Sequence, residues 1–232
     1  MLGIIKNNKH SYGDFGIKIL SRTISNPTKR KIKETIPFMN GSYDFSLLYG
    51  EQSYDERELS YTFSLPKMDK IKLNMLKIKI INWLNEGLQE PLYDDQIPGF
   101  YFLAECTGIE YDESYYNYAQ LTANFIAYPF KISDFQDGHD IWDDFNFELD
   151  MVQDTIFEVN GTKDITLYNN GAIGINPTVI CSNNIEVTKG NSVYKFKQGE
   201  SKAWAFKLDK GINTLTLKGT GTIEFKWCKE VL

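Results

Sequence analysis

The chain has 232 residues, a formal net charge of −6 and an aromatic content of 14 %. This length can bury a full hydrophobic core in one large β domain or in two of ordinary size, and abundant Phe and Tyr favour strands over helices. The charge is uneven, because residues 91–160 hold 15 acidic residues and one lysine. Such a region repels phosphates and argues against nucleic-acid binding.

The N-terminal part begins with predicted strands at residues 13–20, 31–36 and 56–65. Between the second and third of these lies a long, turn-rich connection that contains Pro37 and the turn dipeptide Asn40-Gly41. In the third strand, Leu59, Tyr61 and Phe63 alternate with polar residues. The connection holds no nucleophile with a nearby base, no ligand pair and no phosphate loop, so we interpret it as architecture.

A helix is predicted over residues 67–86, with Pro66 at its start and Gly87 at its end. Its apolar residues form two stripes on roughly opposite sides, separated by lysines: Ile71, Met75, Ile78 and Asn82 on one, and Leu73, Leu76, Ile80, Trp83 and Leu84 on the other. Two stripes require cover on both faces. Either the helix lies between two layers of its own domain, or it packs on its own sheet and on a neighbouring subunit.

Residues 100–111 and 116–131 are predicted to form a long antiparallel pair, with Ala119, Leu121, Ala123, Phe125 and Ala127 on one apolar face. Residues 133–140 are the best linker candidate in the chain. The predicted domains are therefore residues 1–132 and 141–232.

The C-terminal domain shows short strands at regular spacing, which is typical of a sandwich or barrel. The predicted strands are residues 155–159, 164–169, 178–182, 185–188, 192–197, 202–208, 213–218 and 222–228. Asn160-Gly161 and Gly219-Thr-Gly221 are taken as turns between strands, and Trp204, Phe206 and Leu208 as one core-facing row. The predicted fold is thus mainly β: an N-terminal β-sandwich or split barrel with one long helix, and a C-terminal jelly-roll or galectin-like sandwich.

The sequence offers few residues that could form a catalytic or metal site. The two histidines, His10 and His139, fall in different predicted domains, so a His-based metal site or a Ser-His-Asp triad is not expected. The three cysteines form no CxxC pair and are expected as buried, reduced thiols. No run is long enough for a signal peptide or a membrane span. We expect neither an enzyme nor a cofactor.

One binding alternative stays open. Tyr115, Tyr116 and Trp204 are candidates for stacking on sugar rings, although packing between strands explains tyrosines of this kind as well. The corresponding function is a galectin-like module that binds carbohydrate during attachment to the host cell wall.

The order of these elements resembles the distal tail protein family of phages that infect Gram-positive bacteria. The residues that carry the resemblance are Tyr12-Gly-Asp-Phe-Gly16, Ile36-Pro-x-x-x-Gly41-x-x-Asp44, Tyr54-x-x-Arg57-x-Leu-x-Tyr-x-Phe63, Tyr168-Asn-Asn-Gly171 and Lys210-Gly-Ile-Asn213. They cover nearly the whole chain.

The resemblance implies a non-enzymatic protein at the virion tail tip. It implies a hexameric ring of N-terminal domains that joins the tail tube to the tail-associated lysin or tip hub, docks receptor-binding proteins, and lets DNA pass through without binding it. We expect the ring contacts at Pro37, Gly41, Asp44 and Arg57, with Asp44 and Arg57 as candidates for an ion pair, and on the helix at Leu73, Leu76 and Ile80.

Overall fold

The computed structural model describes residues 2–48, 50–115, 118–138 and 151–232, which divide into two compact units. Unit 1 comprises Met1–Lys131 together with Leu232, and unit 2 comprises Ile132–Val231. Residues 132–138 belong to unit 2, where Ser133 and Asp137, two positions of the predicted linker, are buried and donate their backbone N–H groups to Lys229 O and Trp227 O. The domain limits stay a prediction.

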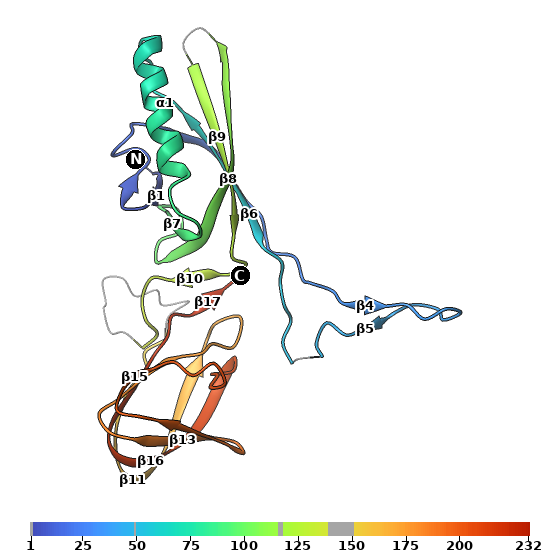
Figure 1. Ribbon diagram of the computed structural model, residues 1–232, viewed down its shortest axis with the longest axis vertical. Helices are drawn as coiled ribbons and strands as arrows, with labels where there is room; N and C mark the ends of the chain where they lie inside the picture. Colours follow the sequence, from blue (N-terminus) through green and yellow to red (C-terminus); the bar gives the residue numbers. More distant parts are fainter. Residues whose placement is uncertain (1, 49, 116–117, 139–150) are drawn as a thin grey trace. The chain divides into compact units, whose positions relative to one another are not determined.

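The sheet of unit 1 follows the strand order β2-β1-β7-β8-β9-β6-β3, and each neighbouring pair is antiparallel (Figure 1). The strands are β1 (Ile4–Lys6), β2 (Lys9–His10), β3 (Lys18–Ile24), β6 (Arg57–Ser64), β7 (Glu90–Asp94), β8 (Phe100–Tyr115) and β9 (Tyr118–Ala127). The long antiparallel pair predicted around residue 114 is confirmed as β8 and β9. Its second strand has all five residues of the predicted apolar face buried.

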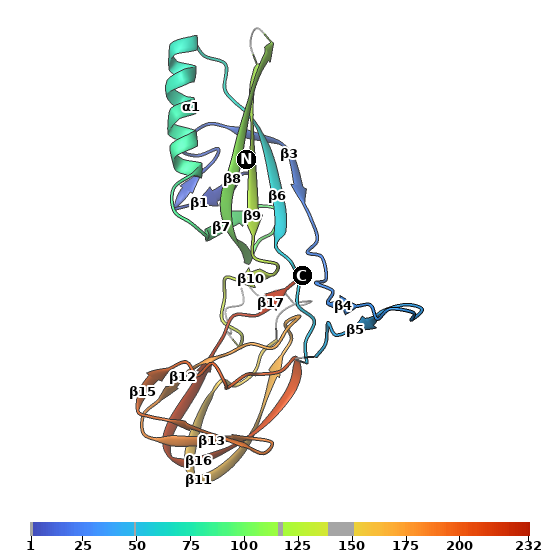
Figure 2. The ribbon, with the colours of Figure 1, turned by 45° about the vertical axis from the view of Figure 1, so that its right-hand side comes forward.

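Helix α1 (Lys70–Leu84) lies against one face of this sheet (Figure 2). It begins three residues later than predicted, because the Asp69 carboxylate accepts the N–H groups of Ile71 and Lys72 at 3.1 Å and so caps the first turn. Asn85 ends the helix, and Gly87 follows with a positive φ of 79°. Ile80, Trp83 and Leu84 of the helix join the core formed by β6, β8 and β9.

Residues 29–54 of unit 1, which we call the arm, hold the two short strands β4 (Lys33–Glu34) and β5 (Tyr43–Asp44). These strands pair with each other and make no pair with the large sheet. Figures 1 and 2 show the arm standing apart from that sheet.

Unit 2 is a second β structure with the strand order β14-β13-β16-β12-β15, to which β11 adds by pairing with β16. Its strands are β11 (Ile156–Asn169), β12 (Thr178–Cys181), β13 (Ile185–Lys189), β14 (Ser192–Phe196), β15 (Gly199–Ser201) and β16 (Gly211–Lys226). Two further short strands, β10 (Lys131–Ser133) and β17 (Glu230–Val231), pair with each other. The predicted mainly-β fold with a helix in its N-terminal part is confirmed.

Two predicted turns in unit 2 are wrong. Asn160-Gly161 does not end a strand, because β11 pairs with β16 without interruption from Ile156–Glu224 to Asn169–Gly211. Gly219 and Gly221, with φ of 150° and 143°, lie inside β16 at the point where its other neighbour changes from β13 to β12. Glycine here permits a bend within a strand, and the pattern of glycines alone does not distinguish a bend from a turn.

The predicted strand at residues 202–208 is also wrong, since only Leu208 makes a bridge, to Ile175. Phe206 and Leu208 are buried as expected, but Trp204 is 91 % exposed. The three cysteines are free thiols; Cys181 is buried as predicted, and Cys106 and Cys228 are partly buried.

Candidate functional site

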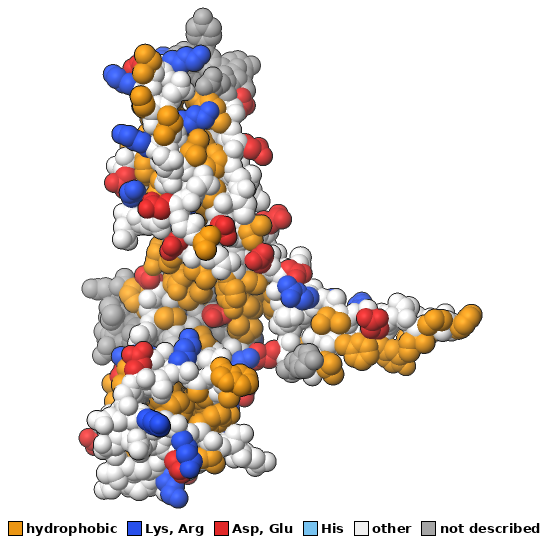
Figure 3. Space-filling view, viewed as in Figure 1, with side chains coloured by type: hydrophobic (Ala, Val, Ile, Leu, Met, Phe, Trp, Pro, Cys, Tyr) orange, Lys and Arg blue, Asp and Glu red, His pale blue; other side chains and the backbone are white. Residues whose placement is uncertain are grey.

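The arm exposes an unusual number of apolar side chains. Each of the following is at least 41 % exposed: Ile32, Ile36, Phe38, Tyr43, Phe45, Leu47 and Leu48. Figure 3 shows apolar side chains running along the arm to its tip. Two short strands cannot bury such residues between themselves, and the pair of β4 and β5 has no sheet behind it. The arm therefore presents an apolar surface that the described residues of unit 1 leave uncovered.

The arm is nevertheless ordered by its own hydrogen bonds. Phe45 N–H donates to Ile32 O at 2.8 Å, and Ile32 N–H donates to the Ser46 hydroxyl at 2.9 Å. Asp44 accepts the Ser46 N–H at 2.9 Å and pairs with Lys31 at 3.2 Å. Hydrogen bonds from the Ser46 side chain and backbone, followed by the Lys31 ammonium, lower the pKa of Asp44 to about 2. Asp44 thus fixes the shape of the arm from within.

Phe38 lies near the tip of the arm in a strained conformation. Its φ is 69°, in the left-handed region that a bulky side chain rarely adopts, and its side chain is fully exposed. It follows Pro37, and Gly41 takes the next positive φ of 89°. Backbone strain of this kind, at a residue whose side chain is exposed, is a feature of sites that engage a partner.

Arg57, by contrast, lies inside unit 1. The alternation of β6 places it on the same face as Leu59, Tyr61 and Phe63, and it is 1 % exposed. Its Nε donates to Pro129 O at 3.0 Å, and its guanidinium lies 5.5 Å from the centre of the Phe102 ring. Burial lowers its pKa. The structure does not bring Arg57 and Asp44 together, since each has a different partner.

The burial of its side chains shows which apolar stripe of α1 faces the core of unit 1. Ile80 is fully buried, and Leu73 and Leu76 are partly buried against the same core, so the three helix positions that we expected at a subunit contact instead face their own unit. The other stripe is the open one, because Ile71, Met75 and Ile78 are 73 %, 60 % and 54 % exposed. We call these three residues the outer stripe.

Contacts of Trp83 fix which side of the helix faces inward. Its Nε1–H donates to Lys6 O at 2.8 Å, and its ring stacks on Phe15 with ring centres 4.6 Å apart. The Lys6 ammonium donates to Glu86 O just beyond the end of the helix. The helix cannot turn its outer stripe inward without losing these contacts.

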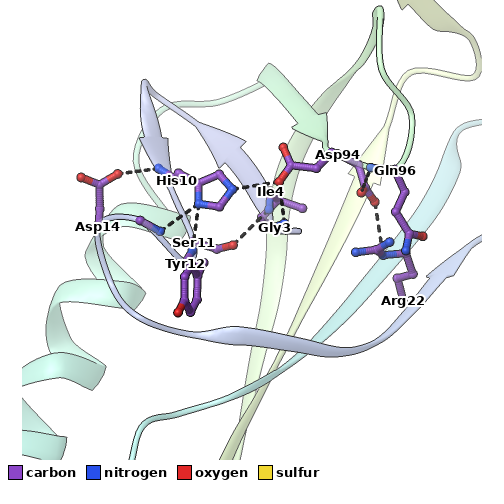
Figure 4. A network of polar contacts seen from close by, with 11 residues as sticks. Gly3, Ile4, His10, Ser11, Tyr12, Asp14, Arg22, Asp94 and Gln96 are labelled. Carbon is purple, nitrogen blue, oxygen red and sulfur yellow. Dashed lines mark hydrogen bonds and ion pairs between the residues drawn. The ribbon is translucent and has the colours of Figure 1, made fainter. Parts of the chain in front are cut away.

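Figure 4 shows a cluster of polar side chains that includes His10, Ser11 and Asp94. It contains the residue types of a catalytic site, but their contacts are not those of one. His10 Nδ1 accepts the N–H groups of Tyr12 and Gly13 at 3.1 and 2.9 Å, and Nε2 lies 2.9 Å from Asp95. Both ring nitrogens are therefore engaged, and the nearby Ser11 hydroxyl accepts the Ile4 N–H instead. A histidine held in this way cannot serve as a base for the serine.

The neighbouring part of this cluster is structural too. Asp94 is buried, accepts the Tyr61 hydroxyl at 3.1 Å and lies 3.5 Å from Arg22 Nε. Burial raises the pKa of Tyr61, and the Asp94 carboxylate adds to that shift. These contacts tie β3, β6 and β7 together. Within the described ranges, no group of three or more His, Cys, Asp or Glu side chains is placed to hold a metal ion.

The structure describes the exposure of one of the three candidate sugar contacts. Trp204 is exposed in unit 2. Tyr115 ends β8, and Tyr116 lies outside the described residues. In the part of the chain that the structure describes, no helix is long and apolar enough to cross a membrane.

Comparison with known proteins identifies the class. The sequence model of the family described as phage tail protein RIFT-related domain matches residues 10–127, just over half of the chain. The protein belongs to this family of phage tail proteins, and the resemblance to distal tail proteins is confirmed.

A solved structure extends the likeness to the whole chain. The crystal structure of the Dit protein of phage SPP1, described as a paradigm of the hub adsorption apparatus in phages that infect Gram-positive bacteria, aligns with a TM-score of 0.67 and 14 % identity over 100 % of both chains. At this identity the likeness establishes the fold. No match was found among curated proteins.

Proposed function

We propose that this protein is a non-enzymatic hub of a phage tail, in which copies of unit 1 assemble into a ring. The observation that carries the proposal is the arm, an ordered extension with an uncovered apolar surface and a strained, exposed Phe38 near its tip. Family membership and the Dit-like fold support a place at the tail tip.

The energetics favour assembly. Burying an exposed Leu, Ile or Phe side chain contributes about 1.5–3 kcal/mol, and the arm offers seven large apolar side chains. The outer stripe of α1 offers three more on the same unit. A contact between two different surfaces of one chain is heterologous, and it produces a closed ring when the rotation between copies closes. A hexamer is the closed form that we propose.

The proposed ring joins the tail tube to the tail-associated lysin or tip hub and docks receptor-binding proteins, by analogy with the SPP1 Dit protein of the hub adsorption apparatus. DNA would pass through the ring without being bound. The excess of acidic residues over residues 91–160 supports this, since a negative surface does not retain phosphates.

Negative-stain microscopy and mass photometry of the purified full chain test the proposal. We expect rings for the wild type and monomers for the double variant Phe38→Ser/Leu47→Ser. Because both residues contact little within unit 1, the variant keeps the wild-type circular dichroism spectrum and melting temperature. The matched control is Ile156→Ser/Val193→Ser, which changes two exposed apolar residues of unit 2 and leaves the rings intact.

Two results would contradict the proposal. A wild-type chain that stays monomeric up to about 100 μM excludes self-assembly of useful affinity. Rings that persist in the Phe38→Ser/Leu47→Ser variant show that the arm is not the contact.

A further inference from the structure

The chain contains three Asn-Gly pairs: Asn40-Gly41 in the arm, and Asn160-Gly161 and Asn170-Gly171 in unit 2. An asparagine that precedes a glycine is prone to lose its side-chain amide without an enzyme. The backbone nitrogen of the glycine attacks the side-chain carbonyl carbon, and glycine has no Cβ to obstruct that attack. All three pairs share this chemistry, so their surroundings decide which of them reacts.

Asn40-Gly41 lies in the connection between β4 and β5, at the far end of the arm in Figure 1. Both residues are exposed to water, and neither belongs to a strand. In the part of the chain that the structure describes, the Gly41 N–H donates to no acceptor. Gly41 has a φ of 89°, and a Cβ there would meet nothing within 4 Å. The attacking nitrogen is therefore free, and the backbone around it has room to turn.

Sheet pairing holds the second pair, Asn160-Gly161, in an extended conformation. Both residues lie within β11, where Asn160 pairs with Thr220 and Gly161 pairs with Gly219 of β16. The attack requires a rotation of the Asn160 backbone out of this extended conformation, because the five-membered ring does not close from it. Pairing with β16 on one side opposes that rotation. We therefore expect Asn160 to react only when this part of β11 opens.

Burial and a hydrogen bond protect the third pair, Asn170-Gly171. Gly171 is buried, and its N–H donates to the side-chain oxygen of Asn169 at 2.9 Å. The nitrogen must lose its proton to attack, and this hydrogen bond, at a place that water does not reach, opposes the loss. A Cβ at Gly171 would lie 3.0 Å from Glu230 O, so the segment also has little room to move. Of the three pairs, Asn40-Gly41 has the surroundings that favour reaction.

We propose that Asn40 is a site of spontaneous deamidation, and that the carboxylate it produces blocks assembly through the arm. The Gly41 nitrogen forms a bond to Asn40 Cγ, the bond from Cγ to the side-chain nitrogen breaks, and that nitrogen leaves as ammonia with the proton from Gly41. Water then opens the cyclic imide at either carbonyl carbon, which gives aspartate or isoaspartate. Nothing is oxidised or reduced, and water is the co-reactant.

The product carries a negative charge within the apolar surface of the arm. Phe38 and Tyr43, two and three residues away along the chain, are both exposed. Taking an unpaired carboxylate out of water into a contact is unfavourable, and isoaspartate also lengthens the backbone. This blocking step rests on the proposed function, in which the arm is the ring contact. A chain left unassembled would lose its ability to join a ring, whereas a ring would cover the arm and exclude the water that the reaction needs.

Peptide mass spectrometry of the purified full chain, incubated at mildly alkaline pH, tests the modification. We expect Asn40 to convert to the acid at least about tenfold faster than Asn160 or Asn170, because an opening that costs about 1.4 kcal/mol already lowers the reactive fraction tenfold. In urea, where the chain is unfolded, the three pairs should convert at similar rates. The Asn40→Gln variant should give no product at this position. Equal rates in the folded chain overturn the proposal, and so does a preference for Asn40 that persists unchanged in urea.

Mass photometry of the Asn40→Asp variant tests the blocking step. It should need at least about tenfold more protein than the wild type to form rings, with an unchanged melting temperature because Asn40 lies outside the core. The matched control is Asn160→Asp, which adds the same charge to unit 2 and should form rings like the wild type. Rings formed as readily by Asn40→Asp as by the wild type overturn the blocking step. A wild type without rings overturns the proposed function and the blocking step together, while the peptide masses, which need no ring, still decide the modification.

Discussion

Ile80 and Ile78 form a matched pair for testing which side of α1 holds the fold of unit 1. They are the same residue type, two positions apart on one helix, but Ile80 is fully buried and Ile78 is 54 % exposed. Replacing each in turn by Ala changes helix propensity equally. Any difference between the two variants therefore reports burial.

The size of the difference follows from the side-chain atoms that are removed. Ile→Ala deletes three carbon groups, worth roughly 2.4 kcal/mol at about 0.8 kcal/mol for each buried group. A residual cavity of about 60 Å³ would add about 1.4 kcal/mol. We expect Ile80→Ala to lower the free energy of unfolding of unit 1 by about 2–4 kcal/mol, and Ile78→Ala to change it by less than about 0.5 kcal/mol.

Hydrogen exchange of the α1 amides, followed by mass spectrometry across a urea series, measures this loss within unit 1 alone. The Ile80→Ala variant should exchange through global unfolding at lower urea than the wild type, and Ile78→Ala should match the wild type. Equal losses in the two variants would refute the burial assignment and with it the choice of the outer stripe as the free surface. Ring formation is the second readout, since Ile78→Asp should disturb it without unfolding the helix.

Three further predictions concern single positions. Gly219→Ala should destabilise unit 2 by about 1–3 kcal/mol, because φ is 150° and the new Cβ would lie 3.0 Å from Asn184 O; an unchanged urea midpoint would contradict the proposed bend. Burial raises the pKa of Cys181 to about 11, so iodoacetamide should label it at pH 8 only after unfolding; rapid labelling of the folded protein would show that the thiol is accessible. The pKa of Asp44 is lowered to about 2, so its contacts in the arm are fully present above its unfolded value of about 3.9 and are lost as the pH falls towards 2; a carboxyl titration by NMR with an ordinary midpoint would contradict the contacts to Ser46 and Lys31.

Local periodicity predicted much of the fold. Alternation in β6 and β9 identified the buried faces, because a strand places every second side chain on the same side. The same alternation made Arg57 a core-facing residue, although its charge suggested a surface contact. The two stripes of α1 were also visible, and the stripe with Trp83 and Leu84 carries more apolar volume. That asymmetry was the available signal for the side that packs inward.

What the sequence could not predict depends on pairing between distant residues. Whether Gly219 and Gly221 make a turn or a bend is decided by β13 and β12, which pair with different parts of β16. Trp204 fits the alternation of a buried strand, and its exposure follows from Asn176, which lies 28 residues away and holds the loop. The exposure of the apolar residues of the arm could not be predicted either, since a sequence does not show whether a second layer covers a strand.

The uncovered surfaces of unit 1 belong to two separate elements, and the part that each takes in assembly is testable. The arm holds its own strand pair, and the outer stripe lies on α1. If the two surfaces meet in the ring as a heterologous contact, removal of either one should prevent the ring from closing. Phe38→Ser/Leu47→Ser and Ile78→Asp should therefore each abolish rings and keep the wild-type urea midpoint. Rings that persist in one of these variants would mean that the surface changed in that variant lies outside the ring contact.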